Sequence, residues 1–386
     1  MTGFSGSYDP GDVTFLLKVI ELAPLPLERR ERLIQSGQRH YSEMIGPEAA
    51  PAPEYLKIFH AALERNLGRL ARDVVRLAAL IANSRPGPVT LVSLARSGTP
   101  VGVLVGRILK NWLQRECAHY SISIIRDRGV DQNALNRLLA ERPAESVVFV
   151  DGWTGKGVIA RELKKALADY NRRTGRDLAG TLAVLTDLAG VAGLAVGADD
   201  YLIPTALLNS VVAGLISRTI LNDELIGPND FHGCLYYKEL APQDLSRWLV
   251  ERVLAQAKLE LASDPSLWAA QPLTPAAQER AAQANATFMA KTRQEFGVVD
   301  DNLIKPGLGE ATRVLLRRAP GLLLLRDPTD PDVAHALSLA AARATPIRAE
   351  PGLPYRAVAI IKDLKGQATS AGPDLNGPLG PRNQLP

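Results

Sequence analysis

The chain has 386 residues, of which 46% are hydrophobic and 22% charged, a composition typical of a globular protein of two or three domains. No apolar run approaches about 18 residues and the start is polar, so we expect no membrane span or signal peptide. The two cysteines offer no disulfide framework, which favours a reducing cytoplasm. The net charge is +4, and residues 305–365 carry all of that excess, with ten Lys and Arg against six Asp and Glu. This basic segment would either bind an anionic partner or form a basic face exposed to solvent.

The N-terminal two thirds of the chain alternate strand and helix signals. A long helix is predicted over 53–83. Short apolar strands follow, most of them separated by helices, at 89–94, 120–125, 147–150, 180–188 and 199–204. This pattern predicts an α/β fold with a parallel sheet covered by helices on both faces. A further helical region is predicted to close the block at 205–221.

A second, smaller α/β pattern lies near the end of the chain. An alanine-rich helical linker precedes it, and a tail rich in Gly, Pro, Asn and Gln follows it. The predicted boundaries are 1–262 for the first domain, 263–301 for the linker, 302–366 for the small domain and 367–386 for a disordered tail.

Two loops at strand ends carry the candidate chemistry. Ligands of such sheets bind at the carboxyl ends of the strands. The first loop, in LVSLARSGTPVG, supplies a guanidinium, small residues and a helix start, which suit an anion, although a plain helix cap explains it equally well. Its candidate residues are Ser93, Arg96, Ser97, Gly98 and Thr99.

The second loop, in VVFVDGWTGKG, is not a nucleotide P-loop, because the spacing is too short and Gly157 stands where a Ser or Thr is needed. An acid followed by a hydroxyl and a helix start suits a phosphorylated sugar. Asp151 would bind hydroxyls or hold Mg²⁺ through water. The other candidates are Gly152, Trp153, Thr154, Gly155, Lys156 and Gly157, with a bare helix cap as the alternative.

Several other polar residues are candidates for substrate contacts. Arg126 and Arg128 follow a strand and would form a mobile cationic loop, or would be ordinary surface arginines. Three polar candidates interrupt an otherwise apolar stretch: Asp200, Asn209 and Arg218. If this stretch is a helix, Asn209 and Arg218 lie on one of its faces. That face would bind an acceptor substrate, form an interface, or bury polar groups that are hydrogen-bonded within the core.

The loops and several further segments resemble a known family. SGSYDPGDVTFLLKVI, LARSGTPVGVL, HYSISIIRDRGVD, FVDGWTGKG and DFHGCLYYKELAPQDLSR are similar to the phosphoribosyltransferase-like family of bacterial tellurite-resistance and stress gene clusters, also catalogued as the cysteine protease StiP. The resemblance covers about residues 3–260. It implies a type I phosphoribosyltransferase-like sheet that binds phosphoribosyl pyrophosphate with Mg²⁺, Asp151 and Arg96 being the catalytic residues. The loop departs from that pattern, because Gly152 replaces the usual second acid.

The small domain resembles a Pelota-type RNA-binding domain in IKPGLGEATRVLLRRAPGLLLLRD. The resemblance implies RNA contacts through Lys305, Gly309, Glu310, Arg313 and Arg317. We therefore expect a phosphosugar or nucleotide partner, structured RNA as a second partner, and no membrane; a homodimer stays open.

Three functions follow from the sequence. The first is transfer of a phosphoribosyl group to a base-like acceptor. The second is nucleotide sensing by a degenerate fold that also binds RNA. The third is a cysteine protease, which needs a thiolate and a histidine; His232 near Cys234 and Cys117 beside His119 are the only close pairs in the sequence.

Overall fold

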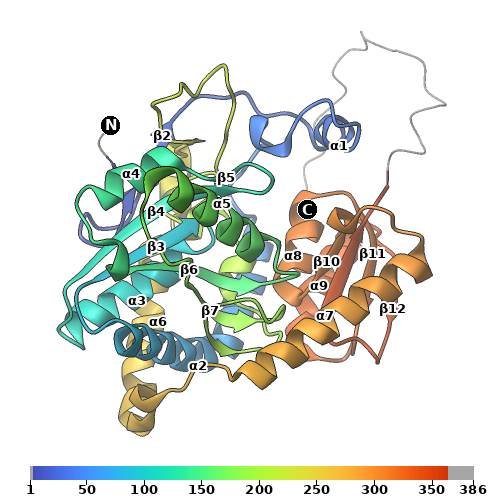
Figure 1. Cartoon of the computed structure of the whole chain (residues 1–386). Coiled ribbons are helices and arrows are strands. Elements are labelled where there is room, and N and C mark those ends of the chain that lie inside the picture. The colour runs from blue at the N-terminus through green and yellow to red at the C-terminus, as the bar shows by residue number, and fades with distance from the viewer. Residues whose placement is uncertain (1–2, 364–386) are drawn as a thin grey trace.

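The computed structural model describes residues 3–363, which lie in two α/β domains (Figure 1). The first holds a seven-stranded sheet in the order β1-β4-β3-β6-β7-β8, with β5 paired to β4. All pairs but β4–β5 are parallel. Its strands are β1 (Thr14–Phe15), β3 (Val89–Ala95), β4 (Cys117–Ile125), β5 (Gly129–Val130), β6 (Val147–Thr154), β7 (Leu182–Asp187) and β8 (Leu194–Gly197).

Helices cover both faces of this sheet, as the apolar strands predict. β3 is almost wholly buried, which requires cover on each side. The helices α2 (Pro53–Ser84), α3 (Thr99–Asn111) and α6 (Ser246–Ser263) share one core, and α4 (Gln132–Leu139) and α5 (Val158–Thr174) share the other (Figure 1). In α2 the buried residues recur every three or four positions, which directs one face to the core.

The C-terminal domain is a four-stranded sheet in the order β10-β13-β11-β12 with helices packed against it. The long helix α7 (Pro275–Phe296) precedes this domain and runs along it (Figure 1). The other elements are β10 (Ile304–Pro306), α8 (Leu308–Arg317), β11 (Pro320–Leu325), α9 (Ala334–Ala342), β12 (Ile347–Ala349) and β13 (Ala357–Ile361). A mixed α/β fold with a parallel sheet is thus confirmed; its type I phosphoribosyltransferase assignment and the domain boundaries stay predictions.

Two predicted elements are wrong. The strand expected at 199–204 is irregular, and the last strand of the sheet is instead β8. The helix expected at 205–221 is two short 3₁₀ turns, Pro204–Ala206 and Ser210–Val212, joined by turns and extended segments. Positive φ angles at Gly214 and Leu215 interrupt any helical course there. The predicted tail lies outside the described residues.

One N-terminal helix lies against the far domain. The helix α1 (Leu27–Gln35) lies above the C-terminal domain in the view of Figure 1, next to the C-terminal end of α8. Glu31, wholly buried, forms an ion pair with Arg318, and Arg30 donates to the Arg317 carbonyl at 3.2 Å. The two domains are therefore tied by a segment from near the start of the chain. No helix among residues 3–363 is long and apolar enough to cross a membrane.

Candidate functional site

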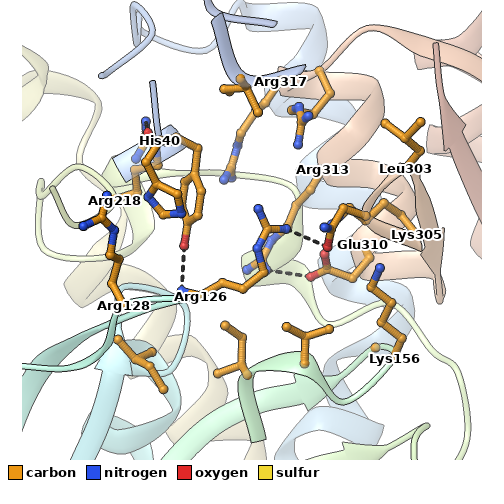
Figure 2. Close-up of a pocket in the computed structure, with 18 of the residues that line it drawn as sticks. His40, Arg126, Arg128, Lys156, Arg218, Leu303, Lys305, Glu310, Arg313 and Arg317 are labelled. Atoms are coloured by element: carbon orange, nitrogen blue, oxygen red, sulfur yellow. Dashed lines mark hydrogen bonds and ion pairs between the residues drawn. The ribbon is translucent and has the colours of Figure 1, made fainter. Parts of the chain in front are cut away.

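A cavity of about 1080 Å³ lies where the carboxyl ends of β3, β4 and β6 meet the C-terminal domain and α1. Its charged lining is dominated by cations from both domains, which Figure 2 shows converging on one space. Five acids line it: Glu31, Glu43, Asp151, Asp300 and Glu310. Ten cations line it: Arg30, Arg39, Arg126, Arg128, Lys156, Arg218, Lys305, Arg313, Arg317 and Arg318.

The second predicted loop, Asp151 to Gly157, forms part of the cavity wall. Asp151 Oδ1 accepts hydrogen bonds from Ser97 Oγ at 2.9 Å and from the Gly152 amide at 2.8 Å, which joins the two predicted loops. Burial raises the pKa of Asp151 to about 6, although both hydrogen bonds oppose that shift. The Asp151 carboxyl thus exchanges a proton near neutral pH beside a cationic cavity.

The conformation of this loop depends on Asp187, which the sequence analysis missed. Asp187 is wholly buried and accepts from Thr154 Oγ1 at 2.6 Å and from the Ala192 amide at 2.8 Å. Thr154 Oγ1 in turn accepts from the Ala189 amide at 3.1 Å. The signal that would have revealed Asp187 is its place at the carboxyl end of an apolar strand, next to β6.

Trp153 packs between the domains. The Arg313 guanidinium lies 4.3 Å from its ring centroid, in cation–π geometry. Gly309 presses on the same ring, because a Cβ there would come within 2.9 Å of it. Trp153 is only 9% exposed. This side chain therefore joins the second loop to α8.

The residues predicted to meet RNA line the cavity or pack at its edge. Lys305, Glu310, Arg313 and Arg317 all line the cavity, and Arg313 pairs with Glu310 at 2.9 Å. The Nε atom of Arg317 is buried without a hydrogen-bond partner among the described residues. Burial, with repulsion from Arg96 and Arg313, lowers the pKa of Arg317 to about 9.

Two lysines meet at one side of the cavity (Figure 2). Burial lowers the pKa of Lys156 to about 7, with Lys305 as the next cause, and burial lowers the pKa of Lys305 to about 8. Lys156 Nζ donates to the Asp301 carbonyl. Both amines therefore gain or lose a proton within the physiological range.

The opposite side of the cavity is built around Tyr41. Its hydroxyl accepts from the Arg126 amide at 2.9 Å, and the Arg126 and Arg218 guanidiniums lie 5.1 and 5.6 Å from its ring centroid. Arg128 pairs with Glu43 at 3.4 Å. Burial lowers the pKa of Arg218 to about 10, and its guanidinium donates to the Tyr41 carbonyl at 2.7 Å. The predicted cationic loop therefore does line the cavity.

Much of the first predicted loop is structural. Ser93 is buried and hydrogen-bonds His119 Nε2 at 2.8 Å, while Thr99 bonds Ser121 at 2.8 Å. Gly98 packs on β6, since a Cβ there would lie 2.3 Å from the Val150 carbonyl oxygen. Among the first-loop candidates only Ser97 lines the cavity.

Arg96 is likewise directed away from the cavity. It is buried and pairs with Glu48 at 3.1 Å, and it donates to the Ile216 carbonyl at 2.7 Å. No local sequence signal connects Arg96 to Glu48, which lies 48 positions earlier. The structure therefore does not place Arg96 where it could bind a phosphate in the cavity directly.

The candidates in 199–221 are separated, because no helix forms there. Asp200 accepts from the Leu308 and Arg356 amides, each at 2.8 Å, and thus holds the C-terminal domain. Asn209 does not line the cavity, and its Oδ1 is buried without a partner among the described residues. Of these candidates only Arg218 reaches the cavity.

Comparison with known proteins identifies both parts of the chain. The family model described as "Tellurite-like stress resistance cysteine protease StiP" matches residues 6–254. The chain is also 40% identical over 372 residues to "Cysteine protease StiP" of Acinetobacter baylyi, covering 94% of this chain and 95% of that protein.

The chain belongs to the StiP family.

A PELOTA RNA-binding domain model matches residues 283–363, so the StiP-family chain carries a Pelota-like domain at its C-terminal end. Both resemblances predicted from the sequence are confirmed. The predicted phosphoribosyltransferase function is wrong, and with it the transferase and phosphoribosyl pyrophosphate assignments, because the family and the relative are named as cysteine proteases. The single acid of the 151–157 loop had already marked a departure from those enzymes.

The two thiols of this StiP-family chain are not paired with an imidazole in the described residues. Cys234 is wholly buried, and the neighbouring His232 Nδ1 bonds Ser123 Oγ at 2.8 Å. Both nitrogens of His119, near Cys117, are bonded to Ser93 and to the Asp12 carbonyl. Burial raises the pKa of each thiol to about 12, so neither is a thiolate at neutral pH in this conformation.

The residues for a metal ion are few in this StiP-family chain. Among residues 3–363 no group of three His, Cys, Asp or Glu side chains could hold one. Asp151 is the predicted contact, and its Oδ1 already accepts two hydrogen bonds. The described residues therefore offer no Mg²⁺ site made by protein ligands alone, and a Mg²⁺ ion here would need water and phosphate oxygens beside Asp151.

Proposed function

We propose that this StiP-family protein binds a phosphate-bearing polyanion in the cavity between its two domains. The excess of cations over acids in the lining supports this, and the buried, unpartnered Nε of Arg317 is the observation that carries it. A buried polar group without a partner costs free energy, and an anion would supply that partner.

The depressed pKa values support the same conclusion. Burial lowers the pKa of Lys156, Lys305 and Arg317, which means that their charged forms lack compensation in the free protein. A phosphate group would restore their charge and accept their hydrogen bonds. Mg²⁺, if it enters, would be carried by the phosphate oxygens, with Asp151 as its protein contact through water. A cytoplasmic location and a homodimer stay predictions.

Isothermal titration calorimetry with tripolyphosphate tests this proposal. We expect Arg317→Gln to weaken binding about tenfold to hundredfold, because one charge-assisted contact of about 1.5–3 kcal/mol is lost. Arg29→Gln is the matched control, since Arg29 is exposed on α1 and does not line the cavity. An absence of binding by the wild type, or equal affinities for the wild type and Arg317→Gln, would contradict the proposal.

Thiol-dependent peptide hydrolysis is the second candidate function, and the names of the family and of the relative favour it. Those names support an enzyme rather than a binding protein alone. Cys234 is the better nucleophile candidate, because both ring nitrogens of His119, near Cys117, are hydrogen-bonded, whereas among the described residues only Nδ1 of His232 is. β9 (Gly233–Cys234) would have to rearrange to expose the thiol.

A fluorescent casein assay tests this second candidate. We expect Cys234→Ser to lower hydrolysis to the background rate and Cys117→Ser, the matched control, to retain it. Hydrolysis that survives in the Cys117→Ser/Cys234→Ser double variant would exclude a thiol mechanism. No hydrolysis by the wild type would count against the peptidase candidate itself.

A further inference from the structure

The basic face of the Pelota-like domain is closed against the N-terminal domain. Gly309 and Arg313 of α8 pack on Trp153, and a Cβ on Gly155 would come within 3.1 Å of Glu310. Arg317 lies in the same row of α8 and lines the cavity. The helix face that the Pelota resemblance assigns to RNA therefore lies at the domain interface.

The space between the two domains is too small for folded RNA. Its volume of about 1080 Å³ is comparable to the upper end of small-molecule sites, at about 1,000 Å³. A structured RNA spans several nucleotides and is recognised over an extended protein surface. Because Trp153 covers Gly309 and Arg313, a folded RNA can therefore lie along the α8 face only after the two domains separate at this interface.

Asp200 accepts several of the hydrogen bonds that hold the interface closed. This carboxylate from the N-terminal domain accepts the Leu308 amide at 2.8 and 3.1 Å and the Arg356 amide at 2.8 Å. Leu308 begins α8, so the carboxylate also lies at the positive end of that helix. Asp200 is buried, and its loss leaves two backbone amides without these acceptors.

A second tie lies on the α1 side of the interface. Glu31 pairs with Arg318, whose Nη2 donates to Glu31 Oε2 at 2.9 Å. Arg318 directly follows α8. Opening the interface therefore requires that both the Asp200 contacts and this buried ion pair are broken.

We propose that RNA and the cavity polyanion bind the same α8 face in mutually exclusive states. In the closed state the polyanion lies between Arg313, Arg317 and the N-terminal domain. In the open state the C-terminal domain leaves Asp200, and RNA phosphates take the place of the polyanion on these arginines. The competition between RNA and the polyanion rests on the proposed polyanion site. The masking of α8, its covering by the N-terminal domain, rests on the domain contacts alone.

The test measures fluorescence anisotropy of a labelled hairpin RNA with an internal loop, using the full chain. We expect Asp200→Ala to bind this RNA about tenfold more tightly than the wild type, because the closed state loses two buried backbone contacts. Asp199→Ala is the matched control: Asp199 is the neighbouring residue, is exposed and pairs with Arg69 of the N-terminal domain. It should bind RNA as the wild type does.

A second variant keeps the test decisive if Asp200→Ala folds poorly. Glu31→Gln removes the charge that pairs with Arg318 and should also strengthen RNA binding, whereas Glu28→Gln, at an exposed position of α1, should not. Tripolyphosphate should displace RNA from the wild type more effectively than sodium chloride of equal ionic strength. Arg313→Gln/Arg317→Gln should weaken RNA binding in every background.

Equal RNA affinities of the wild type, Asp200→Ala and Glu31→Gln would overturn the masking, as would no RNA binding by any of them. RNA that is bound more tightly by the opened variants but resists tripolyphosphate would overturn the competition. Calorimetric binding of tripolyphosphate to the wild type is a separate readout. The polyanion site can therefore stand while this proposal fails.

Discussion

Asp187→Ala is expected to lower the free energy of unfolding by about 3 kcal/mol, because two buried donors lose their acceptor at a cost of about 1–3 kcal/mol each. These donors are the Thr154 hydroxyl and the Ala192 amide. The same change should weaken tripolyphosphate binding, since Thr154 belongs to the loop that lines the cavity. Chemical denaturation followed by tryptophan fluorescence and circular dichroism measures the stability, and calorimetry measures the binding.

Two further variants isolate the role of the Asp187 carboxylate. Asp187→Asn keeps one acceptor oxygen and should cost less than Asp187→Ala. Asp177→Ala, at an exposed position, should leave both stability and binding unchanged. If Asp187→Ala unfolds at the wild-type denaturant concentration, the loop does not depend on this carboxylate.

Polyanion affinity is expected to fall about a hundredfold between pH 6 and pH 9, which corresponds to losing about 1.4 kcal/mol at each of two lysines. The pKa of Lys156 is lowered to about 7 and that of Lys305 to about 8, so both are charged at pH 6 and neutral at pH 9 in the free protein. An anion binds the charged forms, so raising the pH through these values weakens binding.

The ligand for this pH series must keep its own charge constant, which inositol hexasulfate does because its sulfates do not titrate in this range. Lys156→Arg and Lys305→Arg, made together, should flatten the profile between about pH 7 and pH 8, since the pKa of arginine lies well above that of lysine. Asp151 and Arg317, whose pKa values are about 6 and 9, should leave a weaker slope at each end. Lys164→Arg, on α5 and away from the cavity lining, should keep the wild-type profile. An equally steep profile in the Lys156→Arg/Lys305→Arg variant would assign the titration to other groups.

The sequence located the 151–157 loop and the cationic 126–128 turn because the signals for them are local. An apolar strand followed by glycines and a helix start indicates a strand end, and parallel strand ends meet at one edge. Both segments do line the cavity. Predictions of this kind depend only on neighbouring residues.

The partners of these segments were not predictable, because they come from distant parts of the chain. Arg96 looks like a phosphate ligand by sequence, yet Glu48 pairs with it. Arg313 and Arg317 look like surface RNA contacts, yet the N-terminal domain covers them. Neither outcome has a local signal, since both follow from how the two domains pack.

The apolar stretch at 205–221 shows why secondary structure could not be predicted there from the sequence. Its hydrophobic residues and spacing suit a buried helix, but a short apolar run does not by itself distinguish a helix from other buried structure. The chain there forms turns, and the Ser217 hydroxyl accepts from the Leu235 amide at 2.9 Å. Contacts with a segment 18 positions later thus replace the local hydrogen bonds of a helix.

The tie between α1 and the C-terminal domain also affects synthesis of the protein. Glu31 and Arg318 are 287 positions apart, so a ribosome that adds about 5–20 residues per second needs roughly 15–60 s to produce the second after the first. During that interval the emerging chain holds a carboxylate whose native burial requires a partner not yet made. The cavity is therefore completed only late in translation, and a nascent chain cannot bind the polyanion early.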